Sequence, residues 1–436
     1  MKPTGLLIAV AVLAVLGGVT WWSNRKQAAA AKSGDSSVTK ILSIPADGIQ
    51  EVRLKNAQQT VDVKRENGKW QITRPEPLPA DTDAVTTLTS ALSSLNADST
   101  VDDKATDLTP YGLKNPGLEV HVAEKGGKSD DLQIGDETPT GSGNYVKLAG
   151  SPRVYTISTA VKNNIDKNPN DLRDKRLMNF DSDKLTRVDL QPAGKPEVEF
   201  GKNGQNEWQI LKPRVQRADG GQVDSLVSNL KDVRMDLTED AQKATAAFNS
   251  GTKVATAIAT DANGPQTIEV RKDKDNYYAK SSAVAGIYKV SSDFGKSVDK
   301  SLNDFRNKKL FEFGFSDPSK IELKSATYVK TGDKWMSGAK TMDNTTVQNL
   351  IDKLRDLSVT TFDEKGGGEP AFEVTVTSNM GKRVEHVTIT KQGSQDFAKR
   401  NDEPGIYGVD AKAVEDLQKA ATDVKEAAPP APAKKK

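Results

Sequence analysis

The stretch DTDAVTTLTSALSSL at residues 81–95 recurs in altered form at two later places in the chain. It begins with an aspartate, and apolar-leaning residues follow at offsets of 4, 7, 8, 11 and 14. That spacing is typical of one buried face of an α-helix, and aspartate is a natural N-cap residue. The same pattern is present in DGGQVDSLVSNLKDV at 219–233 and in DNTTVQNLIDKLRDL at 343–357. Matching offsets at three places predict three copies of one module.

Other landmarks around these helices repeat in the same order. A turn and a tryptophan precede each helix, and a short strand with a tyrosine lies near the end of each copy. The tryptophans are Trp70, Trp208 and Trp335, and the strands are VYTIS at 154–158, IYKVS at 287–291 and IYGVD at 406–410. Because the tryptophans recur in every copy, we expect them to pack under the helix of their own module rather than to form ligand platforms.

The order of these elements predicts an α+β fold. Each copy has a hairpin, a helix, several antiparallel strands and a closing helix, expected to begin near Ser158, Ser291 and Asp410. The motif LRDKRLMNF at 172–180 returns as FRNKKLFEF at 305–313, so it closes one module and leads into the next. The predicted parts are an N-terminal transmembrane anchor (1–26), a flexible tether (27–38), modules at 39–180, 181–313 and, in shorter form, 314–425, and a disordered Pro/Ala/Lys tail (426–436).

The N-terminus indicates a membrane anchor. Residues 5–22 carry no charge and are flanked by Lys2, Arg25 and Lys26. As a helix this stretch spans roughly 27 Å, which is about the thickness of the hydrocarbon core of a bilayer. A cleaved signal peptide is the alternative, with a small-residue site at 28–31. We expect a single uncleaved span in the inner (cytoplasmic) membrane, with the body of the protein in the periplasm.

Composition narrows the classes of function. The 436 residues include 62 Lys and Arg against 60 Asp and Glu, a formal net charge of +2, so no basic field favours nucleic acid. Cysteine is absent, which excludes disulfides, cysteine nucleophiles and thiolate metal sites, and there are two histidines. We therefore expect no enzyme, no cofactor and no metal. The oligomeric state is left open.

Few residues are candidates for chemistry. His121 and His386 each lie in an alternating strand, where a surface position is expected. Ser337 and Lys340 fit an S-x-x-K pattern, but the pattern occurs at four or more places in this chain and indicates chance. The glycine-rich stretches GSGN at 141–144 and GGG at 366–368 are interpreted as loops, since neither has the Lys-Ser/Thr of a phosphate-binding loop. The sequence thus predicts no catalytic, cofactor-binding or metal-ligating residue.

A set of short motifs in the first two modules resembles a known family. They are LTPYGLKNPGLEVHV (108–122), LQIGDET (132–138), NYVKL (144–148), RVYTIS (153–158) and DLRDKRL (171–177). Together they resemble the bacterial DUF4340 family, whose domain has no assigned activity. The resemblance covers about 60–310 and weakens in the third module. It implies an N-terminal membrane segment with an extracytoplasmic body, and genes beside an ABC-type permease and a GldG-like auxiliary protein.

Three hypotheses for the function follow. The first is a non-enzymatic, membrane-anchored accessory or scaffold component of an ABC-type transport system, with the permease or the GldG-like protein as partner. The second is an envelope module that binds a lipid or a glycan, which predicts an apolar cleft. The third is a hydrolase that uses carboxylates alone, although no pair of carboxylates stands out in the sequence.

Overall fold

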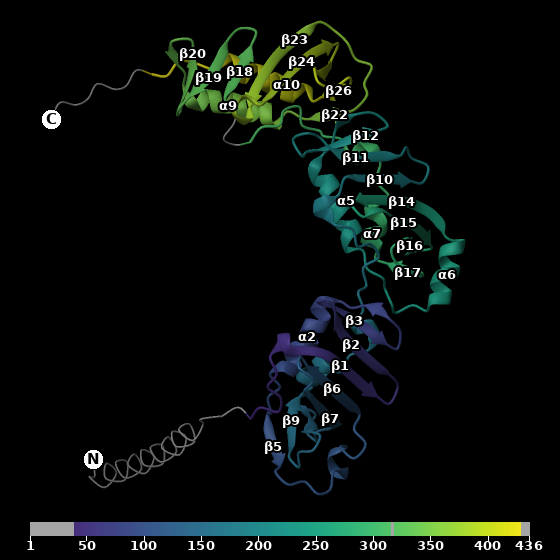
Figure 1. The fold of residues 1–436 in the computed structure, drawn as a ribbon. Helices are drawn as coiled ribbons and strands as arrows, with labels where there is room; N and C mark the ends of the chain where they lie inside the picture. The colour runs from purple at the N-terminus through teal and green to yellow at the C-terminus, as the bar shows by residue number, and fades with distance from the viewer. Residues whose placement is uncertain (1–38, 315–317, 429–436) are drawn as a thin grey trace, which may run out of the picture. The chain divides into compact units, whose positions relative to one another are not determined.

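The computed structural model describes residues 39–314 and 318–428 (Figure 1). The predicted anchor at 1–26 and tether at 27–38 lie outside the described residues, as does the predicted tail from residue 429. Within the described ranges, no helix combines the length and the apolar character needed to cross a membrane. The chain divides between Lys175 and Arg176 into two compact units, and each is described by itself.

The α+β class is confirmed, because the described chain contains three antiparallel sheets with helices (Figure 1). The first sheet lies in the first unit and has the order β4-β3-β2-β1-β6-β7-β8-β9-β5. Its strands are β1 (Ile49–Asn56), β2 (Thr60–Glu66), β3 (Lys69–Arg74), β4 (Leu78–Pro79), β5 (Ser99–Asp102), β6 (Leu118–Glu124), β7 (Ser129–Glu137), β8 (Gly143–Leu148) and β9 (Val154–Ser158).

The second sheet has the order β13-β12-β11-β10-β14-β15-β16-β17, and the third has β21-β20-β19-β18-β23-β24-β25-β26-β22. The strands of the second are β10 (Arg187–Pro192), β11 (Val198–Lys202), β12 (Trp208–Lys212), β13 (Gln216–Arg217), β14 (Thr252–Asp261), β15 (Gly264–Asp273), β16 (Asn276–Ser281) and β17 (Ile287–Val290). Those of the third are β18 (Lys320–Leu323), β19 (Thr327–Thr331), β20 (Lys334–Ser337), β21 (Lys340–Thr341), β22 (Val359–Thr361), β23 (Pro370–Ser378), β24 (Arg383–Gln392), β25 (Gln395–Arg400) and β26 (Ile406–Val409).

All three sheets follow one topology. In each sheet the first four strands in chain order form one meander. A second meander starts on the other side of the first strand. The ninth position is filled by β5 in the first sheet and by β22 in the third. In the second sheet a single bridge between Asp236 and Lys289 replaces that strand. The described sheets are therefore three versions of one module.

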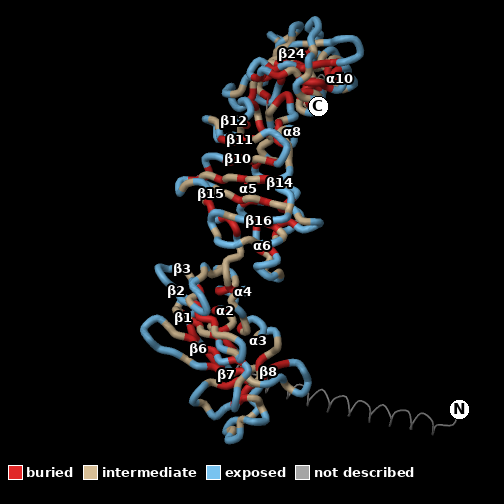
Figure 2. The backbone as a smooth tube through the Cα atoms, turned by 90° about the vertical axis from the view of Figure 1, so that its right-hand side faces the viewer, coloured by how far each residue is buried: buried red, intermediate tan, exposed pale blue. Residues whose placement is uncertain are grey.

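The repeated helices form where the spacing predicted them. They are α2 (Thr82–Ser93), α5 (Gly220–Asp232) and α9 (Asn344–Asp356). The side chains of Asp81, Asp219 and Asp343 accept hydrogen bonds from the first turn, as N-caps do. The residues at offsets 4, 7, 8 and 11 are buried in each helix, and Figure 2 shows the buried backbone gathered in the strands and helices. One apolar face thus attaches each helix to its sheet.

The closing helices also begin at the expected residues. Ser158 caps α3 (Thr159–Ile165), Ser291 caps α7 (Ser292–Ser297) and Asp410 caps α10 (Ala411–Thr422). In the first two modules a second short helix follows, α4 (Pro169–Leu172) or α8 (Leu302–Phe305). In the third module α10 runs on without a break. The second module has one further helix, α6 (Ala241–Ser250), and the 3-10 turns are η1 (Ala46–Gly48), η2 (Thr109–Tyr111), η3 (Ser182–Lys184) and η4 (Asn379–Gly381).

The boundaries expected at 180/181 and 313/314 are placed too late. Leu177, Met178 and Phe180 are buried in the core of the second sheet, and Leu310 and Phe311 in that of the third. The amide of Leu177 donates to the carbonyl of Val233, and the amide of Leu310 to that of Leu357. Each linking segment therefore belongs to the module that follows it.

The third module also extends past the expected start of the tail at Glu426. Glu426 forms a bridge with Met342, and the amide of Ala427 donates to the carbonyl of Thr341 at 2.9 Å. The first two modules make the same return, with bridges from Arg173 to Ala80 and from Arg306 to Ala218. The return recurs although the third copy lacks the LRDKRL-type motif, because its backbone hydrogen bonds do not depend on that motif.

Candidate functional site between the second and third sheets

The two histidines lie on sheet surfaces in separate modules. His121 on β6 is half-buried, and its Nδ1 lies 2.7 Å from Oδ1 of Asp131 on β7. The two residues face each other directly across the antiparallel pair. The sequence did not indicate this carboxylate partner, because the pairing register was not predicted. His386 on β24 contacts the hydroxyl of the cross-strand Thr375 at 2.8 Å.

Ser337 and Lys340 flank a tight turn between β20 and β21 and pair with each other through their backbones. The ammonium of Lys340 pairs with Glu426. The geometry thus gives this lysine a role in fastening the end of the module. The glycine-rich stretches lie at the β7–β8 hairpin and in the loop between β22 and β23.

The three tryptophans are packed to different extents. Trp335 is buried in the core of the third module, and Trp70 is half-buried against that of the first. Trp208 is buried too, and its indole Nε1 donates to Oδ1 of Asp224 on α5 at 2.7 Å. This contact with the helix of its own module agrees with the expected packing role. Trp208 differs because it also lines a pocket.

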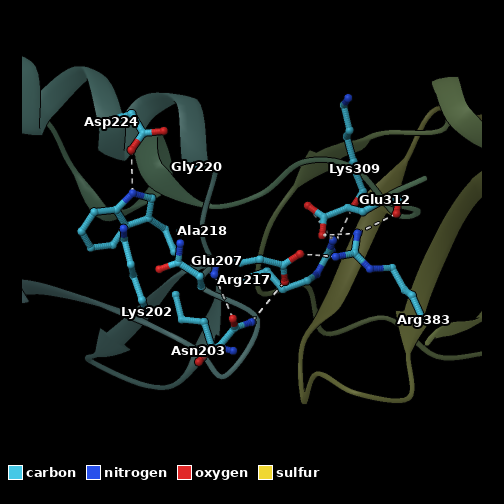
Figure 3. Close-up of a pocket in the computed structure, with 13 residues that line it drawn as sticks. Lys202, Asn203, Glu207, Arg217, Ala218, Gly220, Asp224, Lys309, Glu312 and Arg383 are labelled. Atoms are coloured by element: carbon cyan, nitrogen blue, oxygen red, sulfur yellow. Dashed lines mark hydrogen bonds and ion pairs between the residues drawn. The ribbon is translucent and has the colours of Figure 1, made fainter. Parts of the chain in front are cut away.

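That pocket lies at the meeting of the second and third modules, within the second compact unit, and has a volume of about 560 Å³. Charged and polar side chains dominate its wall (Figure 3). The lining residues are Lys202, Asn203, Asn206, Glu207, Trp208, Gln209, Arg217, Ala218, Gly220, Asp224, Lys309, Glu312 and Arg383.

One end of the pocket is built by the second module. β11 and β12 form a hairpin that places Lys202 opposite Trp208, and the Lys202 ammonium lies 5.1 Å from the centre of the indole ring. Such a cation over an aromatic face is stabilising, and here it also orients the ring. Figure 3 shows Asp224 above this end and Lys202 below it.

The other end is built by the third module. Figure 3 shows Arg383, which begins β24, extending toward the second module. Its guanidinium pairs with Glu207 and donates to the backbone carbonyl of Glu312 at 2.7 Å. A second arginine, Arg217 on β13, lies 3.7 Å from the Glu312 carboxylate. Both arginines therefore converge on Glu312, in the segment that links the two modules.

Arg217 forms the most buried contact across this junction. Its Nε donates to Oε1 of Glu403 at 3.0 Å, and its backbone amide donates to the same oxygen at 3.0 Å. The Tyr407 hydroxyl donates to the other oxygen of Glu403 at 2.8 Å. Burial, followed by the nearby Glu403 charge, raises the pKa of Tyr407 well above its ordinary value. Tyr407 therefore stays neutral and donates a hydrogen bond to the buried carboxylate of Glu403.

A third ion pair lies beside the first two. The buried Arg306, which follows α8, donates through Nη2 to Oδ1 of Asp363 at 2.9 Å, and Arg214 also pairs with this carboxylate. The hydrogen bond from Arg306 lowers the pKa of Asp363. The Arg306 guanidinium also lies 4.2 Å from the centre of the Phe362 ring. We call the three pairs Arg217–Glu403, Arg306–Asp363 and Arg383–Glu207 the ionic joint, because each joins the second module to the third.

Within the third module a further buried pair fixes the linking segment. Arg400 and Glu385 are 2% and 3% exposed, and their charged atoms lie 3.1 Å apart. Arg400 donates to the carbonyl of Leu310, and Glu385 accepts from the amide of Glu312 at 2.9 Å. The corresponding segment ahead of the second sheet is held by neutral groups, because Ser281 donates to the Leu177 carbonyl and Gln266 accepts from the Asn179 amide.

One acidic cluster has the spacing to attract a cation. Carboxylate oxygens of Asp189, Glu197 and Glu199 lie within 4.8 Å of one another. Lys212 already lies 2.7 Å from Glu199 and 3.5 Å from Glu197, and Arg187 lies 3.0 Å from Asp189. Burial raises the pKa of Asp189. These two cations already pair with all three carboxylates, so ion pairing accounts for the cluster.

The ionic joint attaches the second module to the third. Its arginines are matched by carboxylates, and breaking the buried pair Arg217–Glu403 leaves an uncompensated charge. Sequence reasoning missed it because its partners lie far apart, with Arg217 and Glu403 separated by 186 positions along the chain. A signal was present only for the neighbouring pair Arg400–Glu385 within the third module, since its equivalents in the second module are the neutral Ser281 and Gln266.

The comparison with protein families gives two matches to one model, described as a domain of unknown function (DUF4340), at residues 70–216 and 208–369. Each match begins in the hairpin strand that carries a tryptophan, β3 or β12, and runs on into the next sheet. The matched unit is therefore out of phase with the sheets. No curated protein and no solved structure matches the chain. Since the two matches span residues 70–369, more than half of the chain, this protein belongs to the DUF4340 family.

Proposed function

We propose that this chain is a membrane-anchored, extracytoplasmic protein without enzymatic activity that serves as an accessory or scaffold component of an ABC-type transport system. The observation that carries the proposal is the ionic joint. A scaffold has to hold distant surfaces at fixed positions, and three arginine–carboxylate pairs keep the second and third modules in one register. Their directional hydrogen bonds favour a rigid connection over a sliding one.

The placement of the protein rests on its N-terminal sequence. Residues 5–22 carry no charge and are long enough to span a bilayer as a helix. We propose one span in the inner membrane with the modules in the periplasm. In this arrangement the modules extend from the membrane surface, where they can contact a permease and its auxiliary proteins.

The experiment is a mild-detergent pull-down of the tagged full-length protein, read by mass spectrometry. A second sample carries a truncated chain that begins at Val38. Recovery of a permease and its ATPase with the full-length chain supports the proposal, and their loss with the truncated chain assigns the contact to the anchor. Recovery of the full-length chain alone would contradict the accessory role.

A second candidate function is the binding of an envelope lipid or glycan. The observation in its favour is a groove of about 830 Å³ in the third module, with Leu323, Tyr328 and Phe372 in its wall. Extraction of the purified full-length protein, followed by mass spectrometry of lipids and glycans, tests this candidate. A stoichiometric lipid or glycan would favour it, and a clean extract would speak against it.

A further inference from the structure

The groove of the third module lies where the sheet meets the end of α10. Its apolar wall comes from Leu323 on β18, Tyr328 on β19, Phe372 on β23 and Ala421 and Val424 at the helix end. Polar residues complete the rim, namely Lys324, Ser325, Glu373, Gln418 and Thr422. No ion pair of the joint takes part, so this is a separate feature of the surface.

The second module shows what covers the same place when it is filled. There the chain turns after α7 into the short helix α8, and Leu302 packs against the core. Phe305, at the end of α8, is fully buried, and its ring centre lies 4.9 Å from that of Phe200 in an edge-on contact. Two bulky side chains from one helical turn therefore seal this region of the sheet.

Backbone hydrogen bonds identify the equivalent positions in the third module. The amide of Asp219 donates to the carbonyl of Phe305 at 2.7 Å, and the amide of Asp343 donates to that of Lys425 at 2.9 Å. Leu302 and Ala421 lie at the same distance along the chain from Tyr288 and Tyr407. Leu302 is thus replaced by Ala421, and Phe305 is replaced by the smaller Val424 at the same distance along the chain and by the exposed Lys425 at the same backbone contact. The groove is the space that these smaller or exposed side chains leave open.

Tyr328 adds a polar group to this space. In the second sheet Val188 pairs with Phe200, and in the third Ile321 pairs with Tyr328, so the tyrosine occupies the position of Phe200. Tyr328 is 4% exposed and lines the groove, and its hydroxyl is not among the buried polar atoms of the described residues that lack a hydrogen-bond partner. A hydroxyl that water can reach can exchange that water for an acceptor on an occupant of the groove.

We propose that this groove binds a peptide segment of a partner protein, which inserts a leucine or phenylalanine side chain and offers a backbone carbonyl to the Tyr328 hydroxyl. A peptide is the occupant because the second module fills the same place with a peptide turn that carries those two residue types. The polar rim also suits a peptide backbone better than an acyl chain. This inference rests on the proposed scaffold function, for which it supplies the contact surface.

The probe is a fluorescent peptide with the sequence of residues 299–308, DKSLNDFRNK, which contains Leu302 and Phe305. The control peptide carries Leu302→Ala and Phe305→Ala. Binding to the full-length protein in lipid nanodiscs is measured by fluorescence anisotropy. We expect saturable binding of the probe and at least tenfold weaker binding of the control, because the apolar side chains supply the burial.

Two variants of the protein locate the site. Ala421→Leu restores the side chain of the second module, fills the groove and reduces binding at least tenfold. Tyr328→Phe removes the donor and weakens binding about three- to tenfold. The matched control is Tyr288→Phe, whose hydroxyl donates to the carbonyl of Ala285 in the second module and which should bind like the wild type.

Three results would overturn the inference. They are no saturable binding of the probe, equal binding of the two peptides, and wild-type binding by Ala421→Leu. Displacement of the bound peptide by oleate would support the location of the site. Tight binding of oleate without any binding of the peptide would overturn the proposal, because the occupant would then be an acyl chain. A permease recovered in the pull-down while the peptide fails to bind would leave the proposed function standing and remove only the groove from it.

Discussion

Arg217 and Glu403 hold the second and third modules together through two hydrogen bonds to one carboxylate oxygen. The guanidinium Nε and the backbone amide of Arg217 each lie 3.0 Å from Oε1 of Glu403, whose side chain is 6% exposed. The backbone donor makes the contact depend on the path of β13 as well as on charge. Glu403 of the third module is thus held at a fixed position relative to strand β13 of the second module.

Replacing Glu403 with glutamine should destabilise the second compact unit. The change keeps the shape but leaves the Arg217 guanidinium without its carboxylate, and we expect a loss of about 2–4 kcal/mol in the free energy of unfolding. Urea-induced unfolding of the full-length protein, followed by tryptophan fluorescence, measures it. Glu415→Gln is the matched control, because its pair with Lys412 is exposed and should contribute little to stability. Equal midpoints for the two variants would refute the prediction.

Phe305 should tolerate one substitution and not another. Phe305→Ala removes a fully buried ring that contacts Phe200, and we expect a loss of about 3–5 kcal/mol. Phe305→Leu introduces the residue that the first module carries at the equivalent Leu172, and its loss should stay below about 1.5 kcal/mol. Both are measured by urea unfolding. If the leucine variant were as unstable as the alanine variant, the equivalence of the two modules would be wrong.

The N-cap of α9 offers a test of the repeated helix start. The Asp343 side chain accepts hydrogen bonds from the amides of Thr345 and Thr346. Asp343→Ala should lower the free energy of unfolding by about 1 kcal/mol, whereas Asp343→Asn, which keeps an acceptor, should change it by less than half of that. Thermal unfolding of both variants beside the wild type provides the comparison. If the alanine variant were as stable as the asparagine variant, the Asp343 side chain would not stabilise α9 as an N-cap.

The pH dependence of stability should report on Asp363. Hydrogen bonding by Arg306 lowers the pKa of this carboxyl below its ordinary value of 3.8. Its contribution is therefore present above that value, and it is lost as the pH falls through the lower pKa of the folded state. The stability difference between the wild type and Asp363→Asn should be constant near neutral pH and shrink below pH 3.8. A difference that is unchanged at low pH would show that the charge plays no part.

The fold was predictable where the three copies agree. The five-offset pattern located α2, α5 and α9 with their aspartate caps, and Ser158, Ser291 and Asp410 located the closing helices. The boundaries were not predictable in the same way. Segments such as 176–180 lie next to one module along the chain, but their apolar side chains are buried in the next, and only the tertiary contacts decide between them.

The candidate site was beyond reach for a different reason. Ion pairs such as Arg217–Glu403 join residues far apart in sequence, and no periodicity marks such a contact. The groove is defined by the smaller side chains of the third copy, since Ala421 and Val424 lie at the chain positions at which Leu302 and Phe305 seal the second module. The one sign in the sequence was the small residue Ala421 at a repeated core position. It can be interpreted only once the topology shows that Ala421 and Leu302 occupy equivalent positions.

The most direct test of the central claim compares three full-length proteins in one pull-down: the wild type, Glu403→Gln and the control Glu415→Gln. If the ionic joint holds a scaffold for a transporter, the wild type and the control retain a permease and its ATPase, and the Glu403→Gln protein loses most of both. Recovery of all three proteins without a permease would contradict the transporter role. Equal recovery of the permease by all three would show that the joint does not serve it.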